Sequence, residues 1–364
     1  MKKTHKQMLL AVALMSALAF TNSLKACTGI QLTAEDGSVI HARTLEFAVD
    51  LHSDVLVFPR GLTRTGITPE GENGLKWTSK YACTGANGVG LPIIIDGVNE
   101  KGLAAGLFYF PTSVGYPKYV SGDAGKTIAP WQLASWILEN FATVEEVKQN
   151  IGNIIVAEVV LKAWGFSPPV HCIVNDASGK SIVIEYVDGK LNVHENPLGA
   201  MSNSPTFDWH MTNLRNYVNF SLTNRPPVHI GSVELVGFGQ GTGMLGLPGD
   251  FTPPSRFVRA VAYSTSALPS KTGDAAVLQA FHILNMFDIP KGTVREGETD
   301  DHGNVVADYT VWTSASDLKA RRFYIRTYEN SQIRSVDLTT LKLDGKDIVT
   351  ISLKGDEVVK SLNP

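Results

Sequence analysis

Short runs of apolar and β-branched residues, bounded by turn-forming residues, dominate the first part of the chain after its N-terminal segment. Residues 28–34 and 39–47 are two such runs, and the turn sequence EDGS between them predicts a β-hairpin. A third run covers residues 54–61, and residues 91–110 contain two more around the turn-rich sequence DGVNEKG. Sheet structure is therefore predicted for most of this region.

The apolar spacing changes to a helical period in two later regions. Within residues 127–151, five apolar side chains would share one broad helix face: Trp131, Leu133, Trp136, Ile137 and Phe141. Residues 255–287 are also predicted to be helical, most clearly over 274–287. Residues 170–186 predict a second hairpin around the turn DASGK, and three C-terminal runs predict strands: 308–315, 321–328 and 348–353.

The order of the elements is strands, helices, strands, helices, strands. This order excludes the regular alternation of a doubly wound sheet and predicts an α+β fold, with antiparallel sheets packed between helical layers. Residues 219–254 are rich in Gly and Pro and are predicted to form long surface loops. The length would permit two domains, but no Pro-, Ser- or Gly-rich linker divides the chain, so residues 27–364 are expected to form a single domain.

The first 26 residues have the pattern of an export signal. Basic residues precede an apolar stretch at 8–20, which is too short to span a bilayer because about 20 residues are needed. Small residues at Ser23 and Ala26 predict cleavage before Cys27. No later run reaches the length of a membrane span. The mature chain is therefore expected outside the cytoplasm, in a bacterial periplasm.

The net charge and the sequence motifs disfavour several kinds of binding partner and cofactor. Removal of residues 1–26 would take away four lysines and no acidic residue, so the net charge would move from −3 to −7, which disfavours nucleic acids and anionic membranes. GTGMLG (241–246) matches G-x-G-x-x-G, but no βαβ unit surrounds it. Histidine and cysteine spacings give no support for a metal site, and His210 is expected to be structural. No cofactor is therefore expected.

The three cysteines lie in different settings. Cys83 and Cys172 are in apolar, strand-like sequence, so they are either small buried residues or a disulfide with each other. In an oxidising compartment the odd count leaves at least one thiol free, and Cys27 would be that residue. Three hypotheses remain for Cys27: a structural residue, a lipid-modified residue in the Leu-x-x-Cys-like sequence LKAC, or a catalytic residue that begins the mature chain.

The catalytic hypothesis has a clear physical basis. A thiol with a pKa of about 8.5 is only partly ionised at neutral pH, whereas an α-amine with a pKa of about 8 can accept its proton. Cleavage before Cys27 would therefore create nucleophile and base on one residue. Lipid modification excludes this chemistry, because it alkylates the sulfur and usually acylates the amine. Lys25 is unusual in a lipidation sequence, whereas Leu24 fits ordinary signal cleavage imperfectly.

Sequence blocks along nearly the whole region after residue 26 resemble one family. CTGI, HARTLEF, DGVNEKGL, MSNSPTFDWHMTNLRNY and FGQGTGMLGLPGDFTPPSRF are similar to the choloylglycine hydrolase and penicillin V acylase family of N-terminal-nucleophile cysteine amidases. The resemblance implies an αββα sandwich of two antiparallel sheets between helical layers. It also implies hydrolysis of a linear amide C–N bond, and a homotetramer in which residues 216–240 help assembly.

The resemblance implies roles for four residues around the thiol. Cys27 would be the nucleophile, with its own α-amine as base. Arg43 in ARTLEF would stabilise the thiolate region electrostatically, and Arg256 in PPSRF would be a second arginine near the nucleophile. Glu46 stands where much of the family has an aspartate that would bond to the α-amine. The side chain of Glu46 is one methylene longer, so this hydrogen bond is not assured by the resemblance.

The resemblance also implies an oxyanion hole. Asn203 in MSNSP would be its side-chain donor, and Tyr109 in LFYF would supply a main-chain N–H. One such donor can be worth about 3 kcal/mol in the transition state. The α-ammonium would then protonate the leaving amine, and water would hydrolyse the thioester. Taken alone, Arg43 could form an ion pair with Glu46, and Asn203 could be a turn residue before Pro205.

The substrate class is left open between several acyl amides. The family acts on conjugated bile salts, penicillin V and N-acyl homoserine lactones, so an apolar pocket is expected. Its candidate lining residues are Phe47, Phe58, Phe108, Tyr109 and Phe110. Bile salt hydrolases commonly have Asn at the position of Tyr109 and penicillin V acylases commonly have Tyr, so a penicillin V-like amide is the preferred small-molecule substrate. The non-enzyme alternative is a binding protein anchored by lipid on Cys27.

Overall fold

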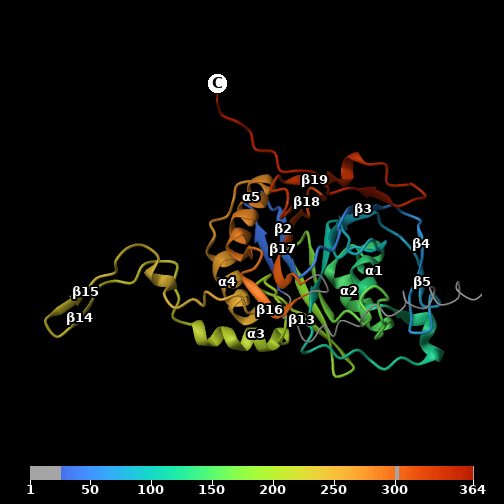
Figure 1. Cartoon of the computed structure of the whole chain (residues 1–364), viewed down its shortest axis with the longest axis horizontal. Coiled ribbons are helices and arrows are strands. Elements are labelled where there is room, and N and C mark those ends of the chain that lie inside the picture. The colour runs from blue at the N-terminus through green and yellow to red at the C-terminus, as the bar shows by residue number, and fades with distance from the viewer. Residues whose placement is uncertain (1–25, 300–302, 364) are drawn as a thin grey trace, which may run out of the picture.

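Two antiparallel sheets lie face to face in the computed structural model, which describes residues 26–299 and 303–363 (Figure 1). The first sheet follows the order β1, β2, β17, β18, β19, with β16 also paired to β17. These strands are β1 (Cys27–Thr33), β2 (Val39–Phe47), β16 (Val294–Thr299), β17 (Val305–Asp317), β18 (Arg322–Thr327) and β19 (Arg334–Asp337). The predicted hairpin over 28–47 is confirmed as β1 and β2, and a C-terminal strand, β17, lies against β2.

The second sheet has eight strands, in the order β13, β12, β11, β8, β7, β6, β3, β20. Their bounds are β3 (Val55–Phe58), β6 (Cys83–Ala86), β7 (Asp96–Asn99), β8 (Leu103–Tyr109), β11 (Val170–Asp176), β12 (Ser181–Val187), β13 (Lys190–Glu195) and β20 (Val349–Ile351). The second predicted hairpin is confirmed as β11 and β12. Short pairs lie outside these sheets: β4 (Thr63–Thr65) with β5 (Lys76–Thr78), β9 (Thr127–Ile128) with β10 (Ile155–Val156), and β14 (Val228–Ile230) with β15 (Val233–Leu235).

Helices cover the outer faces of the sheets. α4 (Pro253–Ser266) and α5 (Gly273–Leu284) pack on the first sheet, whereas α1 (Leu133–Asn140) and α2 (Val144–Asn150) pack on the second. Because both faces of the first sheet are covered, β2 buries every residue instead of alternating between buried and exposed. The α+β prediction and the αββα sandwich are confirmed.

The predicted helical run over 127–151 contains two short helices. α1 ends at Asn140, and Phe141 is extended. Thr143 precedes α2 and caps its N-terminus, because its side chain accepts a hydrogen bond from the N–H of Glu146 at 3.2 Å. Threonine is a favoured residue at the start of a helix, since it satisfies an N–H group that has no partner within the helix.

A long excursion separates α3 (Phe207–Asn213) from α4 and projects from the sandwich (Figure 1). It was predicted as surface loops, and its regular structure is limited to short 3₁₀ turns and the β14–β15 hairpin. The sequence GTGMLG lies here and contains a short 3₁₀ turn, Thr242–Met244. Several apolar side chains of the excursion are exposed: Val228, Ile230, Val233, Leu235, Val236 and Phe238.

The expected leader lies outside the described residues except for Ala26. Among the helices of residues 26–299 and 303–363, none is long and apolar enough to cross a membrane. Cys83 and Cys172 are fully buried free thiols. They lie on β6 and β11, three strand spacings or about 14 Å apart, whereas a disulfide needs Cα atoms within about 7 Å. The possible disulfide between them is therefore excluded in favour of two small buried residues.

Candidate active site

Cys27 is the first residue of β1 and is almost completely buried, with 3% of its surface exposed. Its backbone nitrogen donates a hydrogen bond to Oδ1 of Asn203 at 2.7 Å. On the preceding residue, the carbonyl oxygen of Ala26 accepts from the N–H of Glu46 at 2.9 Å. The Ala26–Cys27 peptide bond is thus held between the end of β2 and the loop that carries Asn203.

Two buried arginines act on the Cys27 thiol. Burial raises its pKa, whereas the positive charges of Arg43 and Arg256 lower it, and the carboxyl group of Glu46 raises it. Both guanidinium groups are fully buried. Arg43 and Arg256 therefore counteract the cost of forming a thiolate in a site that excludes water.

Asn203 lies in the loop between β13 and α3. Its Oδ1 accepts from the backbone nitrogen of Cys27 and from Nη2 of Arg256 at 2.6 Å, while its Nδ2 donates to the carbonyl oxygen of Tyr109 at 2.7 Å. Oδ1 faces two N–H donors and Nδ2 faces a carbonyl acceptor, so these partners determine which end of the amide is oxygen and which is nitrogen. The role of Asn203 as an oxyanion donor requires the second hydrogen on Nδ2, since Tyr109 takes the first.

Arg256 connects the start of β1 to the first turn of α4. Its Nη1 donates to the carbonyl oxygen of Cys27 and to Oγ1 of Thr28 at 2.9 Å, and its Nε donates to the carbonyl oxygen of Phe251 at 2.8 Å. Together with the bond to Asn203, these contacts fix the planar guanidinium in one orientation. Arg256 thus lies beside Cys27, where the resemblance places it.

Arg43 occupies β2, the strand paired with β1. Its guanidinium lies 3.9 Å above the ring of Phe108 and 5.3 Å from that of Trp312. Nη1 donates to the carbonyl oxygen of Leu107, and Nη2 has no partner among the described residues. Aromatic faces stabilise a buried cation without neutralising it, so the charge of Arg43 remains available to the Cys27 thiolate.

Glu46 makes no hydrogen bond to the backbone nitrogen of Cys27 in the described structure. Its Oε1 accepts from Oγ1 of Thr310 at 3.1 Å, and its Oε2 has no partner among the described residues. Burial raises the pKa of Glu46 to about 8, against the opposing charges of Arg256 and Arg43. Where the structure is described, the backbone nitrogen of Cys27 meets Asn203 instead. The longer side chain of Glu46 is held by Thr310 on β17, a strand that is far from Glu46 in the sequence.

An aromatic group borders the site at the end of β8. Tyr109 and Phe47 form an edge-to-face contact at 6.3 Å, Phe47 stacks on Trp164 at 5.3 Å, and Trp164 stacks on Phe166 at 5.6 Å. The sequence reasoning named Phe47 and Tyr109 but missed Trp164 and Phe166. Both residues lie in an irregular stretch between β10 and β11. Aromatic residues there follow neither a helical nor a strand pattern, and this was the only feature that could have singled them out.

The other proposed pocket-lining residues, Phe58, Phe108 and Phe110, lie outside this aromatic group. Phe108 supports Arg43 from below its guanidinium, and Phe110 stacks on His171 with ring centroids 4.2 Å apart. Phe58 belongs to the core between the second sheet and its helices, where Arg64 lies 4.8 Å above its ring. All three side chains are fully buried in the structure, and their part in a substrate pocket stays a prediction.

A family model described as linear amide C–N hydrolases, choloylglycine hydrolase family, matches residues 27–351. The chain is 36% identical over 328 residues to a bile salt hydrolase/transferase of Clostridium perfringens, covering 89% of this chain and 96% of the relative. It is 30% identical over 320 residues to a penicillin V acylase of Pectobacterium atrosepticum, covering 82% of this chain and 77% of the relative.

Solved structures show the same likeness. The conjugated bile acid hydrolase of Clostridium perfringens superposes with a TM-score of 0.81 at 32% identity, covering 93% of this chain and all of that one. The penicillin V acylase of Agrobacterium tumefaciens superposes with a TM-score of 0.71 at 28% identity, covering 90% and 92% of the two chains.

Proposed function

The chain belongs to the choloylglycine hydrolase family of linear amide C–N hydrolases, and we propose that it cleaves acyl amides with Cys27 as an N-terminal nucleophile. The observation that carries this proposal is the convergence of Asn203, Arg43 and Arg256 on Cys27. These residues come from three separate parts of the chain. A cysteine with only a packing role would not need two buried arginines beside it.

The mechanism follows from the contacts of Cys27. Cleavage after Ala26 frees the α-amine, which takes the thiol proton, and the thiolate attacks the acyl carbonyl. The second hydrogen on Nδ2 of Asn203 and the main-chain N–H of Tyr109 stabilise the oxyanion. The α-ammonium gives its proton to the leaving amine as the C–N bond breaks. Water, deprotonated by the α-amine, then hydrolyses the thioester and releases the acid.

We propose conjugated bile salts as the first substrate class to test. Tyr109 by itself favours a penicillin V-like amide, but the comparisons with known proteins support the bile salt alternative better. Identity is 36% to a bile salt hydrolase/transferase against 30% to a penicillin V acylase, and the TM-scores of 0.81 and 0.71 follow the same order. A bile salt and a penicillin share a bulky apolar acyl part next to an amide.

A penicillin V-like aryl amide is the second candidate, and one observation favours it. Phe47, Tyr109, Trp164 and Phe166 form a continuous group of aromatic rings beside the site. Flat aryl groups pack well against such rings, since offset and edge-to-face contacts add to the gain from burial. N-acyl homoserine lactones, with a linear acyl chain, remain a third class.

Export and assembly are part of the proposal. Cleavage of the leader before Cys27 places the mature enzyme in the periplasm, and a homotetramer would bury the apolar side chains exposed on the β14–β15 excursion. A contiguous exposed apolar surface of this kind is typical of a protein–protein contact. The binding-protein alternative requires lipid on Cys27, which removes both reacting groups.

The test begins with the intact mass and N-terminal sequence of the protein from the exported fraction. An unmodified N-terminal Cys27 supports the amidase, and diacylglycerol with fatty acid on that residue contradicts it. Turnover is then compared for a glycine-conjugated bile salt, penicillin V and an N-acyl homoserine lactone. The variant Cys27→Ser should lose turnover of every cleaved amide, while Cys172→Ser, a matched change in a buried thiol, should keep it.

A further inference from the structure

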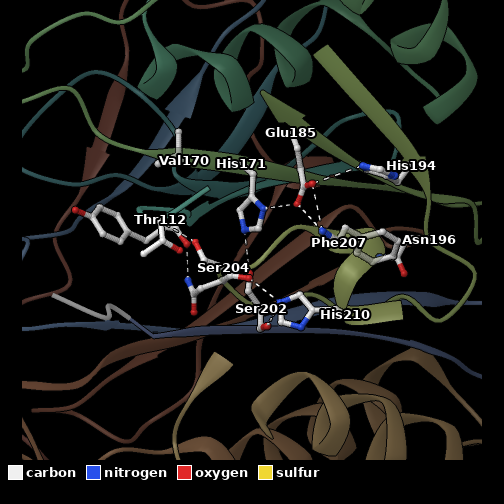
Figure 2. A network of polar contacts seen from close by, with 12 residues as sticks. Thr112, Val170, His171, Glu185, His194, Asn196, Ser202, Ser204, Phe207 and His210 are labelled. Carbon is white, nitrogen blue, oxygen red and sulfur yellow. Dashed lines mark hydrogen bonds and ion pairs between the residues drawn. The ribbon is translucent and has the colours of Figure 1, made fainter. Parts of the chain in front are cut away.

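Buried polar side chains hold the main chain at Ser202 and Phe207 (Figure 2), on either side of Asn203, the residue that meets Cys27. Midway along the loop between β13 and α3, Met201 and Gly29 exchange backbone hydrogen bonds at 2.8 and 3.1 Å. Beyond Met201, the loop continues to α3 at Phe207. Side chains of the second sheet and α3 determine where this stretch lies.

Glu185, on β12, fixes two points of this stretch. Its Oε1 lies 3.0 Å from Nδ1 of His171, whose Nε2 lies 3.0 Å from the carbonyl oxygen of Ser202. The carboxylate also accepts from the N–H of Phe207 at 3.0 and 3.2 Å. Figure 2 shows His171 between Glu185 and Ser202. One buried carboxylate thus holds the main chain before and after Asn203.

The charge state of Glu185 fits this role. Burial alone would raise its pKa, but hydrogen bonds from His171 and His194 lower the pKa of Glu185 to about 2. The group therefore stays ionised and accepts hydrogen bonds at neutral pH. Charge-assisted hydrogen bonds are shorter and stronger than neutral ones, so they suit a fixed geometry.

His210, on α3, holds the peptide of Asn203 itself. Its Nε2 lies 2.8 Å from the carbonyl oxygen of Asn203, and its ring stacks on Phe257 at 4.7 Å. Burial lowers the pKa of His210 to about 4, so the ring is neutral, and the carbonyl contact places its one hydrogen on Nε2. Phe257 follows Arg256, which binds Oδ1 of the same Asn203. The main-chain and side-chain oxygens of Asn203 are therefore both held.

The geometry points to His171, Glu185 and His210 as positioning residues for the amide hydrolysis. They fix the carbonyl groups of Ser202 and Asn203, so that the Asn203 side chain reaches Cys27 and Tyr109 at 2.7 Å each. This inference rests on the proposed function, because it needs Asn203 to act in catalysis. A misplacement of about 1 Å can cost about 100-fold in rate, so a small shift of this peptide should be visible in kcat.

The experiment compares two substitutions of His210. His210→Phe keeps a ring on Phe257 and removes the donor, whereas His210→Gln restores a donor near the position of Nε2. We expect His210→Phe to lower kcat about tenfold or more with KM within about twofold, and His210→Gln to recover most of the loss. Glu139→Gln is the matched control. Glu139 is a buried carboxylate that accepts from Trp77 and Ser79 in the outer layer, and this variant should change stability but not kcat.

A second measurement does not depend on the substrate. Alkylation of Cys27 by iodoacetamide is followed against pH, with Cys27→Ser as background, because Asn203 contacts the nitrogen that becomes the α-amine. His210→Phe should change the rate profile several-fold, and Glu139→Gln should leave it unchanged. If the wild type cleaves no acyl amide, the proposed function fails while this profile still tests positioning. Unchanged kcat and an unchanged profile in folded His210→Phe would overturn the inference.

Two further outcomes are decisive. Equal losses in His210→Phe, His210→Gln and Glu139→Gln would mean that only general stability matters, and would also overturn the inference. If His210→Phe does not fold, Glu185→Gln is measured in the same way, since it keeps the shape of the side chain and removes its charge. A loss of kcat with unchanged KM in that variant supports the inference, and wild-type kinetics contradict it.

Discussion

Oδ1 of Asn203 lies 2.7 Å from the backbone nitrogen of Cys27, although 176 residues separate them in the chain. The same oxygen accepts from Arg256, and the amide nitrogen donates to Tyr109. The start of β1, the end of β8, the loop before α3 and the first turn of α4 therefore meet at one amide group. A change at Asn203 should affect chemistry more than it affects the fold.

The substitution Asn203→Ala tests this point. It removes the proposed oxyanion donor and the acceptor of Nη2 of Arg256, so we expect kcat to fall about 10²–10³-fold. Asn99→Ala is the control, because Asn99 is equally buried and its Nδ2 donates to the carbonyl oxygens of Leu138 and Phe141 at 2.8 and 2.7 Å. That variant should lower the thermal midpoint and keep kcat. Similar kcat values for the two variants would contradict the role of Asn203.

Arg43 should control the ionisation of Cys27. Its charge lowers the pKa of the thiol against the effect of burial, so Arg43→Met should move the midpoint of Cys27 alkylation upward by about one pH unit or more. Arg64→Met is a matched control, since Arg64 also lies over a phenylalanine ring, 4.8 Å above Phe58. Alkylation rates across pH measure both. An unshifted midpoint in Arg43→Met would show that Arg43 serves only packing.

Glu46 should make stability depend on pH. Burial raises its pKa in the folded protein to about 8, above its ordinary value, so folding favours the neutral carboxyl group. The stabilisation is complete below the ordinary pKa and is lost as the pH rises toward about 8. Urea unfolding of the wild type and Glu46→Gln at about pH 5 and about pH 9 should show the wild type weakening relative to the variant. A pH-independent difference would contradict the raised pKa.

The projecting hairpin should determine assembly. Changing Val228, Ile230, Val233 and Leu235 to serine removes exposed apolar surface without touching the sandwich, so we expect smaller particles and an unchanged kcat per chain. Light scattering after size-exclusion chromatography gives the mass. Serine at Val358 and Val359, two exposed residues of the C-terminal tail, is the control. A wild type that is already monomeric would contradict the tetramer proposal.

Local sequence was sufficient for the hairpins and for the class of fold. The turns EDGS and DASGK join strands that pair with each other, and this pairing depends on residues close together in the chain. The pairing of β2 with β17 was not predictable in this way. Both strands are buried on both faces, so their side-chain patterns do not select a partner or a register.

The sequence by itself determined the family and the sandwich of sheets and helices, and it named Cys27, Arg43, Asn203 and Arg256 as candidate site residues. Only the tertiary structure decided what those residues contact. Glu46 turns to Thr310 because β17 lies beside β2, and Asn203 presents its oxygen to Cys27 because Arg256 and Tyr109 select the orientation of its amide. The hydrogen bonds of these side chains depend on partners from distant parts of the chain, and the order of residues does not show which of those partners meet.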